Sequence, residues 1–192
     1  MRVENGILIG QVTNLDDPQS LGRIKVKYPT LGGQESDWAP IATLMGGKER
    51  GSYFIPEVDE VVLVAFAHGD PRHPYILGGV WNTKDKPPAT DGDKKKNNWR
   101  FLESRSGHKF KFDDTSGSEK IEIIDKDGSH KIVIDSANKK IRVVCENGDV
   151  EVSAGSGKVT VNATTIELKA TGSMTLSANG DVTISGATVK IN

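Results

Sequence analysis

The chain has 192 residues, with 25 Lys and Arg against 26 Asp and Glu, which gives a formal net charge of −1. This balance has no basic excess, so we expect no nucleic-acid partner. No apolar run is long enough to span a bilayer, and residues 1–7 lack the apolar core of a secretory signal. We therefore expect assembly in the cytoplasm without a signal peptide, and action outside the cell would need another delivery route.

The first part of the chain, residues 1–82, predicts a small all-β domain. Alternating apolar runs indicate strands, and a polar turn with Pro18 separates the first two. Pro40 places the third run at an edge or a bulge. The predicted strands are residues 6–13, 22–28, 37–42, 60–66 and 74–81. Five strands without helical periodicity favour an OB-fold barrel, and a small SH3-like barrel is the alternative.

Two short segments follow this domain. Residues 83–98 are rich in charge, Pro and Asn, which predicts a linker without a core. Residues 99–118 contain two further alternating runs, and Phe110 and Phe112 share one face of the second. We interpret residues 99–118 as the transition, or collar, where the next region begins.

Residues 119–192 repeat one small unit nine times, a pair of apolar residues two positions apart followed by a turn. Strict alternation of this kind predicts short strands that are buried on one face only. Cys145 falls on the same inward phase and is interpreted as a small core residue. The predicted inward residues are Ile121, Ile123, Ile132, Ile134, Ile141, Val143, Cys145, Val150, Val152, Val159, Val161, Ile166, Leu168, Met174, Leu176, Val182, Ile184, Val189 and Ile191.

The repeat can hide its apolar face in two ways. Three units give a coil of roughly 18 to 25 residues, which suits a single-chain β-solenoid. However, no aromatic residue follows Phe112, so the interior is thin. Open strand edges are an aggregation hazard, and three copies wound around one axis would cover them. The pattern favours an intertwined trimeric β-helix, a needle, over the solenoid.

Four motifs in chain order carry a resemblance to a known family. They are NLDDPQSLGRIKVKYP at residues 14–29, FIPEV at 54–58, VAFAHGDPRHPYILGGVWN at 64–82 and ESRSGHKFKFDDTSGSEKI at 103–121. Together they resemble the OB domain and the start of the β-helix in VgrG-type and phage baseplate V-type spike proteins. The resemblance implies a homotrimeric, non-enzymatic spike that pierces an envelope for a contractile injection machine, such as a phage tail, a tailocin or an extracellular injection particle.

Departures from the family imply partners. A full VgrG has a hub region before its OB domain, so a separate baseplate hub protein is expected at the OB-fold end. No lysozyme domain stands between barrel and needle. Some spikes end in an iron-binding His-x-His apex, but no His follows His130. We therefore expect a PAAR-type tip protein to contact the C-terminal end, through Val189, Lys190, Ile191 and Asn192.

The sequence predicts no catalytic, cofactor-binding or metal-binding residue. The run from His68 to His73 has the Gly and Pro of a tight turn, and His108 and His130 are interpreted as isolated polar residues. Pairs of carboxylates, such as Asp125 with Asp127, lie in predicted turns. The alternative function is a trimeric receptor-binding or polysaccharide-binding or -degrading fibre. The lack of Trp, Tyr and Phe in the repeats argues against it.

Overall fold

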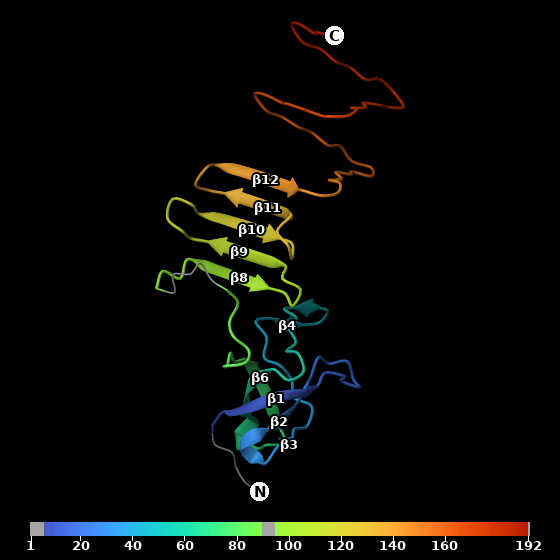
Figure 1. The fold of residues 1–192 in the computed structure, drawn as a ribbon. Coiled ribbons are helices and arrows are strands. Elements are labelled where there is room, and N and C mark those ends of the chain that lie inside the picture. Colours follow the sequence, from blue (N-terminus) through green and yellow to red (C-terminus); the bar gives the residue numbers. More distant parts are fainter. Residues whose placement is uncertain (1–5, 90–94, 192) are drawn as a thin grey trace. The chain divides into compact units, whose positions relative to one another are not determined.

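The computed structural model describes residues 6–89 and 95–191, and these ranges are all-β apart from two single-turn 3₁₀ helices, η1 (Pro29–Leu31) and η2 (Ala67–Gly69). The chain divides into two compact units, Met1–Val144 and Cys145–Asn192 (Figure 1). Residues 1–5, 90–94 and 192 lie outside the description. They include part of the predicted linker and one predicted tip contact. The predicted domain boundaries stay predictions.

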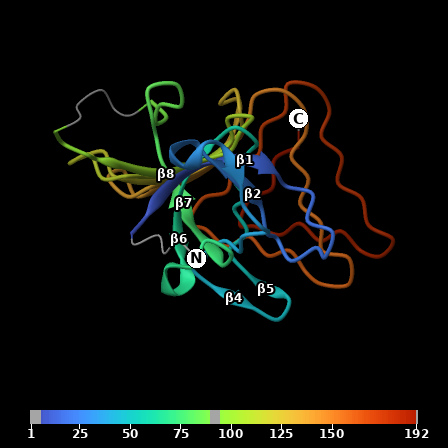
Figure 2. The ribbon, with the colours of Figure 1, turned by 90° about the horizontal axis from the view of Figure 1, so that it is seen from below.

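The first sheet has the strand order β3-β2-β1-β6-β7, and the pairs between neighbouring strands are antiparallel. β1 lies at its centre. The strands are β1 (Leu8–Asn14), β2 (Lys25–Tyr28), β3 (Gln34–Glu35), β6 (Val61–Phe66) and β7 (Pro74–Gly79). A separate hairpin of β4 (Gly46–Gly47) and β5 (Arg50–Gly51) projects from this domain (Figure 2).

The core of this domain consists of alternate residues from several strands. Because side chains alternate between the faces of a strand, every second residue of β2 and β6 points inward. The fully or almost fully buried residues are Val12, Ile24, Val26, Tyr28, Ala39, Val62, Val64 and Ile76. Gly10 brings β1 close to its neighbours, since a Cβ there would lie 3.0 Å from methyl groups of both Val26 and Val64. The central position of β1 therefore depends on a glycine at residue 10, which has no side chain to separate the strands.

Residues 37–42 do not form the continuous strand that the sequence predicts. They form two isolated β-bridges instead. Ala39 exchanges backbone hydrogen bonds with Ile24, just before β2. Ile41 bridges Ile76 of β7, and the carbonyl of Pro40 accepts a hydrogen bond from Ile76 N–H at 2.9 Å. Pro40 has no N–H to continue a ladder, so the segment changes partner there. By joining the β2 side to β7, it closes the sheet, as an OB-type barrel requires.

Two loops of this domain are organised around one aspartate each. The Asp17 carboxylate, whose side chain is 3% exposed, accepts hydrogen bonds from the backbone N–H groups of residues 19, 21 and 23 and a bidentate pair from the Arg23 guanidinium. The Asp70 carboxylate accepts a similar pair from Arg72 beside η2. His68 in η2 has a φ of 51°, so the tight turn expected there is confirmed. Both aspartates belong to the sequence motifs that carry the resemblance.

The second sheet is a five-stranded meander in the order β12-β11-β10-β9-β8. Its strands are β8 (Trp99–Glu103), β9 (Lys109–Asp113), β10 (Lys120–Ile124), β11 (His130–Asp135) and β12 (Lys140–Cys145). Both strands expected in residues 99–118 are therefore present. The first three repeat pairs, in β10, β11 and β12, also lie in strands as the alternation predicts.

The second unit differs from the alternating strands expected for it. Residues 146–191 are extended but include no assigned strand or helix. Figure 1 shows them, in orange and red, as long passes that reverse direction. A strand is defined by its hydrogen-bonded neighbour, and these passes find none within one chain. The trimeric β-helix stays a prediction. In the described ranges, no helix is long and apolar enough to cross a bilayer.

Replacing Asp17 by Asn should lower the melting temperature, because Asn cannot accept all of these hydrogen bonds or pair with Arg23. The Arg23 guanidinium and three backbone N–H groups hold the pKa of Asp17 well below its ordinary value, although partial burial acts in the opposite direction. Its contribution to stability is therefore complete above the unfolded pKa of about 3.9 and is lost as pH falls through the lower folded value.

Thermal melts of both proteins from pH 7 to pH 2 measure how the contribution of Asp17 to stability depends on pH. The difference between the wild type and Asp17→Asn should be largest at pH 7 and shrink on acidification. Asp16→Asn is the matched control, because the Asp16 side chain is exposed and should change little. A pH-independent difference would contradict the assignment to the Asp17 charge.

Candidate functional site

The second sheet has one apolar face, which its register aligns into two rows. Leu102, Phe110, Ile123 and Ile132 lie opposite one another across β8 to β11. The second row runs from Arg100 through Phe112 and Ile121 to Ile134. The Phe110 and Phe112 rings pack edge to face with their centroids 5.0 Å apart. We call these eight residues the apolar face.

This face is largely open in the single chain. Its apolar members on β8 to β11 are 39% to 57% exposed except Ile121, which is half-buried. On β12, Ile141 and Val143 are 72% and 64% exposed. Contiguous apolar patches of this kind are uncommon on monomeric proteins and mark interaction surfaces. The arrangement can bind another apolar surface. Four residues of the apolar face, together with Ile141 and Val143 of β12, are among those predicted to face a needle interior.

The opposite face of the sheet is polar and yet more deeply buried. Lys111 of β9 stands across from Glu122 of β10, with Nζ and Oε2 2.5 Å apart, and both residues are buried. In the next row Lys120 stands between Asp113 and Asp135. Burial acts to raise the pKa of Asp113, but hydrogen bonds from Thr115 and the nearby lysines outweigh it and lower the pKa. Opposite charges across neighbouring strands stabilise this register.

Two aromatic residues of β8 complete the polar face. The Lys111 ammonium lies 4.2 Å from the centroid of the Trp99 ring, and the Lys109 ammonium lies 5.9 Å from that of Phe101. Lys109 also pairs with Glu103 at 3.4 Å. Sequence alternation places these residues on one face but does not reveal the pairing, because cross-strand partners depend on the register.

The remaining predicted needle residues lie in the second unit, where each except Cys145 is more than half exposed. Exposed fractions range from 51% for Val189 to 91% for Ile191. Cys145, at the end of β12, is half-buried, and its thiol donates to the backbone carbonyls of Asn147 and Asp149. Their burial around a common axis stays a prediction. The other members of this group are Val150, Val152, Val159, Val161, Ile166, Leu168, Met174, Leu176, Val182 and Ile184.

The β10–β11 turn gathers three groups that could hold a metal ion. One ligand atom each from Asp125, Asp127 and His130 lies within 4.8 Å of the others. Asp125 Oδ2 is 2.9 Å from His130 Nδ1, and the Ser129 hydroxyl contacts all three residues. Burial acts to raise the pKa of Asp125, but hydrogen bonds from the backbone N–H and the side chain of His130 and from the Ser129 hydroxyl lower it overall. The interpretation of His130 as isolated is therefore wrong. The short spacing from residue 125 to 130 within a turn was the available signal.

An apolar loop of the first domain is a second candidate contact surface. Residues 43–58 include Leu44, Tyr53 and Phe54, which are 98%, 80% and 67% exposed. They line a cavity of about 770 Å³ with the β4–β5 hairpin. Sequence reasoning gave FIPEV at 54–58 as a motif but did not identify this surface.

Comparison with known proteins gives the class of the first domain. Residues 8–81 match the family described as the Type VI secretion system/phage-baseplate injector OB domain. This part of the chain is similar to that injector OB domain, and the likeness agrees with the closed five-stranded barrel. The expected resemblance to VgrG-type and baseplate V-type spike proteins is thereby confirmed for this region.

Relatives extend the likeness to particular spike proteins. The chain is 31% identical over 106 residues to the Type VI secretion system spike protein VgrG3 of Vibrio cholerae serotype O1, and 29% over 104 residues to the actin cross-linking toxin VgrG1 of that species. It is 35% identical over 72 residues to the spike protein VgrG5 of Pseudomonas aeruginosa. These matches cover 51%, 50% and 35% of this chain. They span only about a tenth of the length of these relatives.

Replacing Lys111 by Met should reduce the free energy of unfolding by about 3 kcal/mol, because the Glu122 carboxylate stays buried without its ammonium partner. Urea or guanidinium denaturation followed by circular dichroism measures the change. The double variant Lys111→Met, Glu122→Leu should recover part of the loss. Lys109→Met is the control, because the Lys109 side chain is 34% exposed. Equal losses at Lys109 and Lys111 would contradict a specific role for the buried pair.

Proposed function

We propose that this chain forms the non-enzymatic central spike of a contractile injection machine, as a homotrimer that joins a baseplate hub to a tip protein. The observation that carries the proposal is the open apolar face of the second sheet, which continues into a second unit whose extended passes have no strand partners. The injector OB domain and the VgrG relatives support the same class of machine.

Three copies give each exposed feature a partner. Three apolar faces turned toward a common axis bury one another, as the faces of a triangular prism do, and leave the polar faces outside. Beyond Cys145, strands of the three chains alternate along the axis, so that each chain supplies the edges that its neighbours lack. A closed three-fold arrangement also leaves no edge free for uncontrolled association along the shaft.

Two protein partners complete the spike in this proposal. The exposed apolar side chains of residues 43–58 offer the OB-fold end a surface for a baseplate hub protein. At the other end, Val189, Lys190, Ile191 and Asn192 leave strand edges for a PAAR-type tip protein to cap. Asn192 itself lies outside the described residues. We place the assembly at the baseplate of a phage virion or a phage tail-like particle that is built in the cytoplasm.

The proposed action is mechanical. Beyond Ser153 the chain has few charged residues and many small Thr, Ser, Ala and Gly residues, which keep a shaft narrow. Backbone hydrogen bonds along the axis resist bending. Such a needle would cross the target envelope when the sheath contracts. The proposal assigns no catalytic step to the chain.

The oligomeric state tests the proposal directly. Light scattering on the purified chain should give three times the monomer mass of 20.7 kDa. Val161→Asp should abolish the folded trimer, because three carboxylates would meet at one level of a dry axis. Thr160→Asp, the neighbouring residue on the outward phase, is the matched control and should keep the trimer. A monomer of wild-type mass, or an intact trimer of Val161→Asp, would contradict the intertwined needle.

The partners are tested by a density map of an assembled particle isolated from the producing strain. We expect additional protein density against residues 43–58 at the OB-fold end and a compact cap beyond residue 191. A spike tip bare of further density would contradict the tip protein, and solvent around residues 43–58 would contradict the hub contact. Either result would leave the trimer itself intact.

A further inference from the structure

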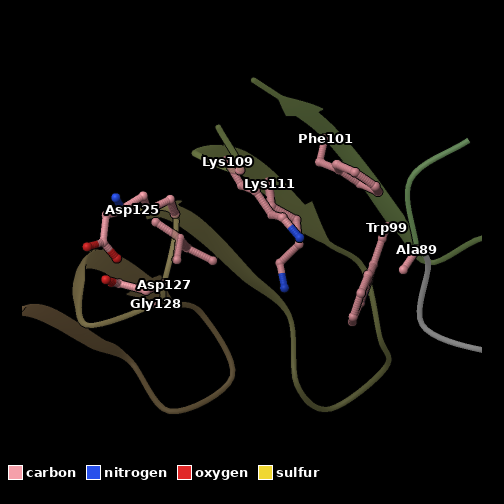
Figure 3. Close-up of a pocket in the computed structure, with 11 residues that line it drawn as sticks. Ala89, Trp99, Phe101, Lys109, Lys111, Asp125, Asp127 and Gly128 are labelled. Atoms are coloured by element: carbon pink, nitrogen blue, oxygen red, sulfur yellow. The ribbon is translucent and has the colours of Figure 1, made fainter. Parts of the chain in front are cut away.

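We infer that the polar face of the second sheet carries a binding groove for a neutral hexopyranose unit of a polysaccharide. The groove has a volume of about 290 Å³ and crosses the sheet diagonally. Trp99 and Phe101 form one wall, and the Asp125–Gly128 turn forms the other (Figure 3). Lys109 and Lys111 of β9 lie between these walls.

The charges of the groove are largely balanced, which argues against an ionic ligand, since the lining residues Lys126 and Asp127 also carry opposite charges. The ammonium of Lys111 is held by Glu122 and that of Lys109 by Glu103. The Asp125 carboxylate is engaged by His130 and Ser129. A phosphate would need uncompensated cations, and a divalent cation would have to displace the hydrogen bonds that Asp125 accepts from His130 and Ser129. The groove therefore has no strong preference for either sign of charge.

A neutral polyol matches what remains. Half-buried aromatic rings offer apolar surface, and the adjoining carboxylate and ammonium groups retain free lone pairs and protons for hydroxyl groups. Among the described residues, no group accepts a hydrogen bond from the Trp99 indole N–H, which leaves a further donor. A pyranose has apolar C–H faces and a rim of hydroxyls, so it can pack against the ring surface that Lys109 and Lys111 leave open and bond to the opposite wall at once.

The position of the groove suits a ligand outside the spike. Trp99, Phe101, Lys109 and Lys111 all lie on the face opposite the apolar face, by the alternation of β8 and β9. If the trimer proposed above forms, three grooves remain open around one axis and can engage one polysaccharide chain or surface together. Only this three-fold multiplication rests on the proposed function, because the groove itself is complete in one chain.

The test uses the full-length protein and follows the three indole N–H signals of Trp38, Trp81 and Trp99 by NMR. Maltohexaose and chitohexaose serve as neutral probes and polygalacturonate as the acidic one. We expect a neutral probe to move the Trp99 signal saturably, with a dissociation constant of about 1 mM. The Trp38 and Trp81 signals should stay in place.

Two variant pairs decide the site. Trp99→Leu should weaken binding at least about tenfold, whereas Trp81→Leu, whose side chain is exposed, should not. Because loss of Trp99 also removes the ring beneath Lys111, a milder variant is included. Asp127→Ala should weaken binding severalfold, and the exposed Asp114→Ala is its control.

Three results would overturn the inference. The first is that neither neutral probe moves the Trp99 signal, and the second is that only polygalacturonate moves it. The third is that the folded variants Trp99→Leu and Asp127→Ala bind the sugar with unchanged affinity. Light scattering on the same samples reports the trimer independently. A trimer without sugar binding would refute the groove alone, and sugar binding by a monomer would refute the spike assembly alone.

Discussion

The structure depends on one constraint, that the described residues of the first unit leave the apolar face of the β8–β12 sheet largely uncovered. Burial of apolar area contributes roughly 25 cal/mol per Å², so leaving two rows of Phe, Ile and Leu in water is unfavourable. Covering this face requires a surface of matching length and chemistry. In the proposed trimer, a second and third copy provide that surface without any new sequence, and they also give the unpaired passes of residues 146–191 their strand neighbours.

The polar face fixes how the apolar rows align. Lys111 meets Glu122, and Lys120 meets Asp113, only in the observed register. A slip of one residue would turn these charges toward the apolar side and the isoleucines toward water. The ion pairs therefore specify the register as well as stabilise it. Because this face satisfies its charges by itself, the sheet can present its other face to partners without losing its strand order.

The alternation of apolar and polar residues predicted the strands β8 to β12 and which of their residues share a face. This was possible because side chains of any strand point to alternate faces, whatever the strand packs against. The alternation did not predict features that depend on contacts between distant parts of the chain. Ala39 and Ile41 alternate as a strand would, yet Pro40 makes them bridge two different partners. His130 looked isolated because its partner Asp125 lies across a turn. The Trp99–Lys111 contact depends on the register of β8 and β9. The strand pairings proposed for residues 146–191 lie between copies of the chain, so a single chain does not display them.

The two faces of the sheet also have separate roles in the proposed spike, one in assembly and the other in contact with molecules outside it. In the proposed trimer, the apolar face binds copies of the chain non-directionally, with a strength that grows with the buried area. The polar face cannot bind copies of the chain in that way. Its paired charges give a charged envelope little to attract or repel, which agrees with the net charge of −1 for the whole chain. Contacts made by this outer face must then come from shape, aromatic surface and hydrogen bonds. Those are the interactions that the Trp99 groove offers, and they persist at high salt because they do not depend on net charge.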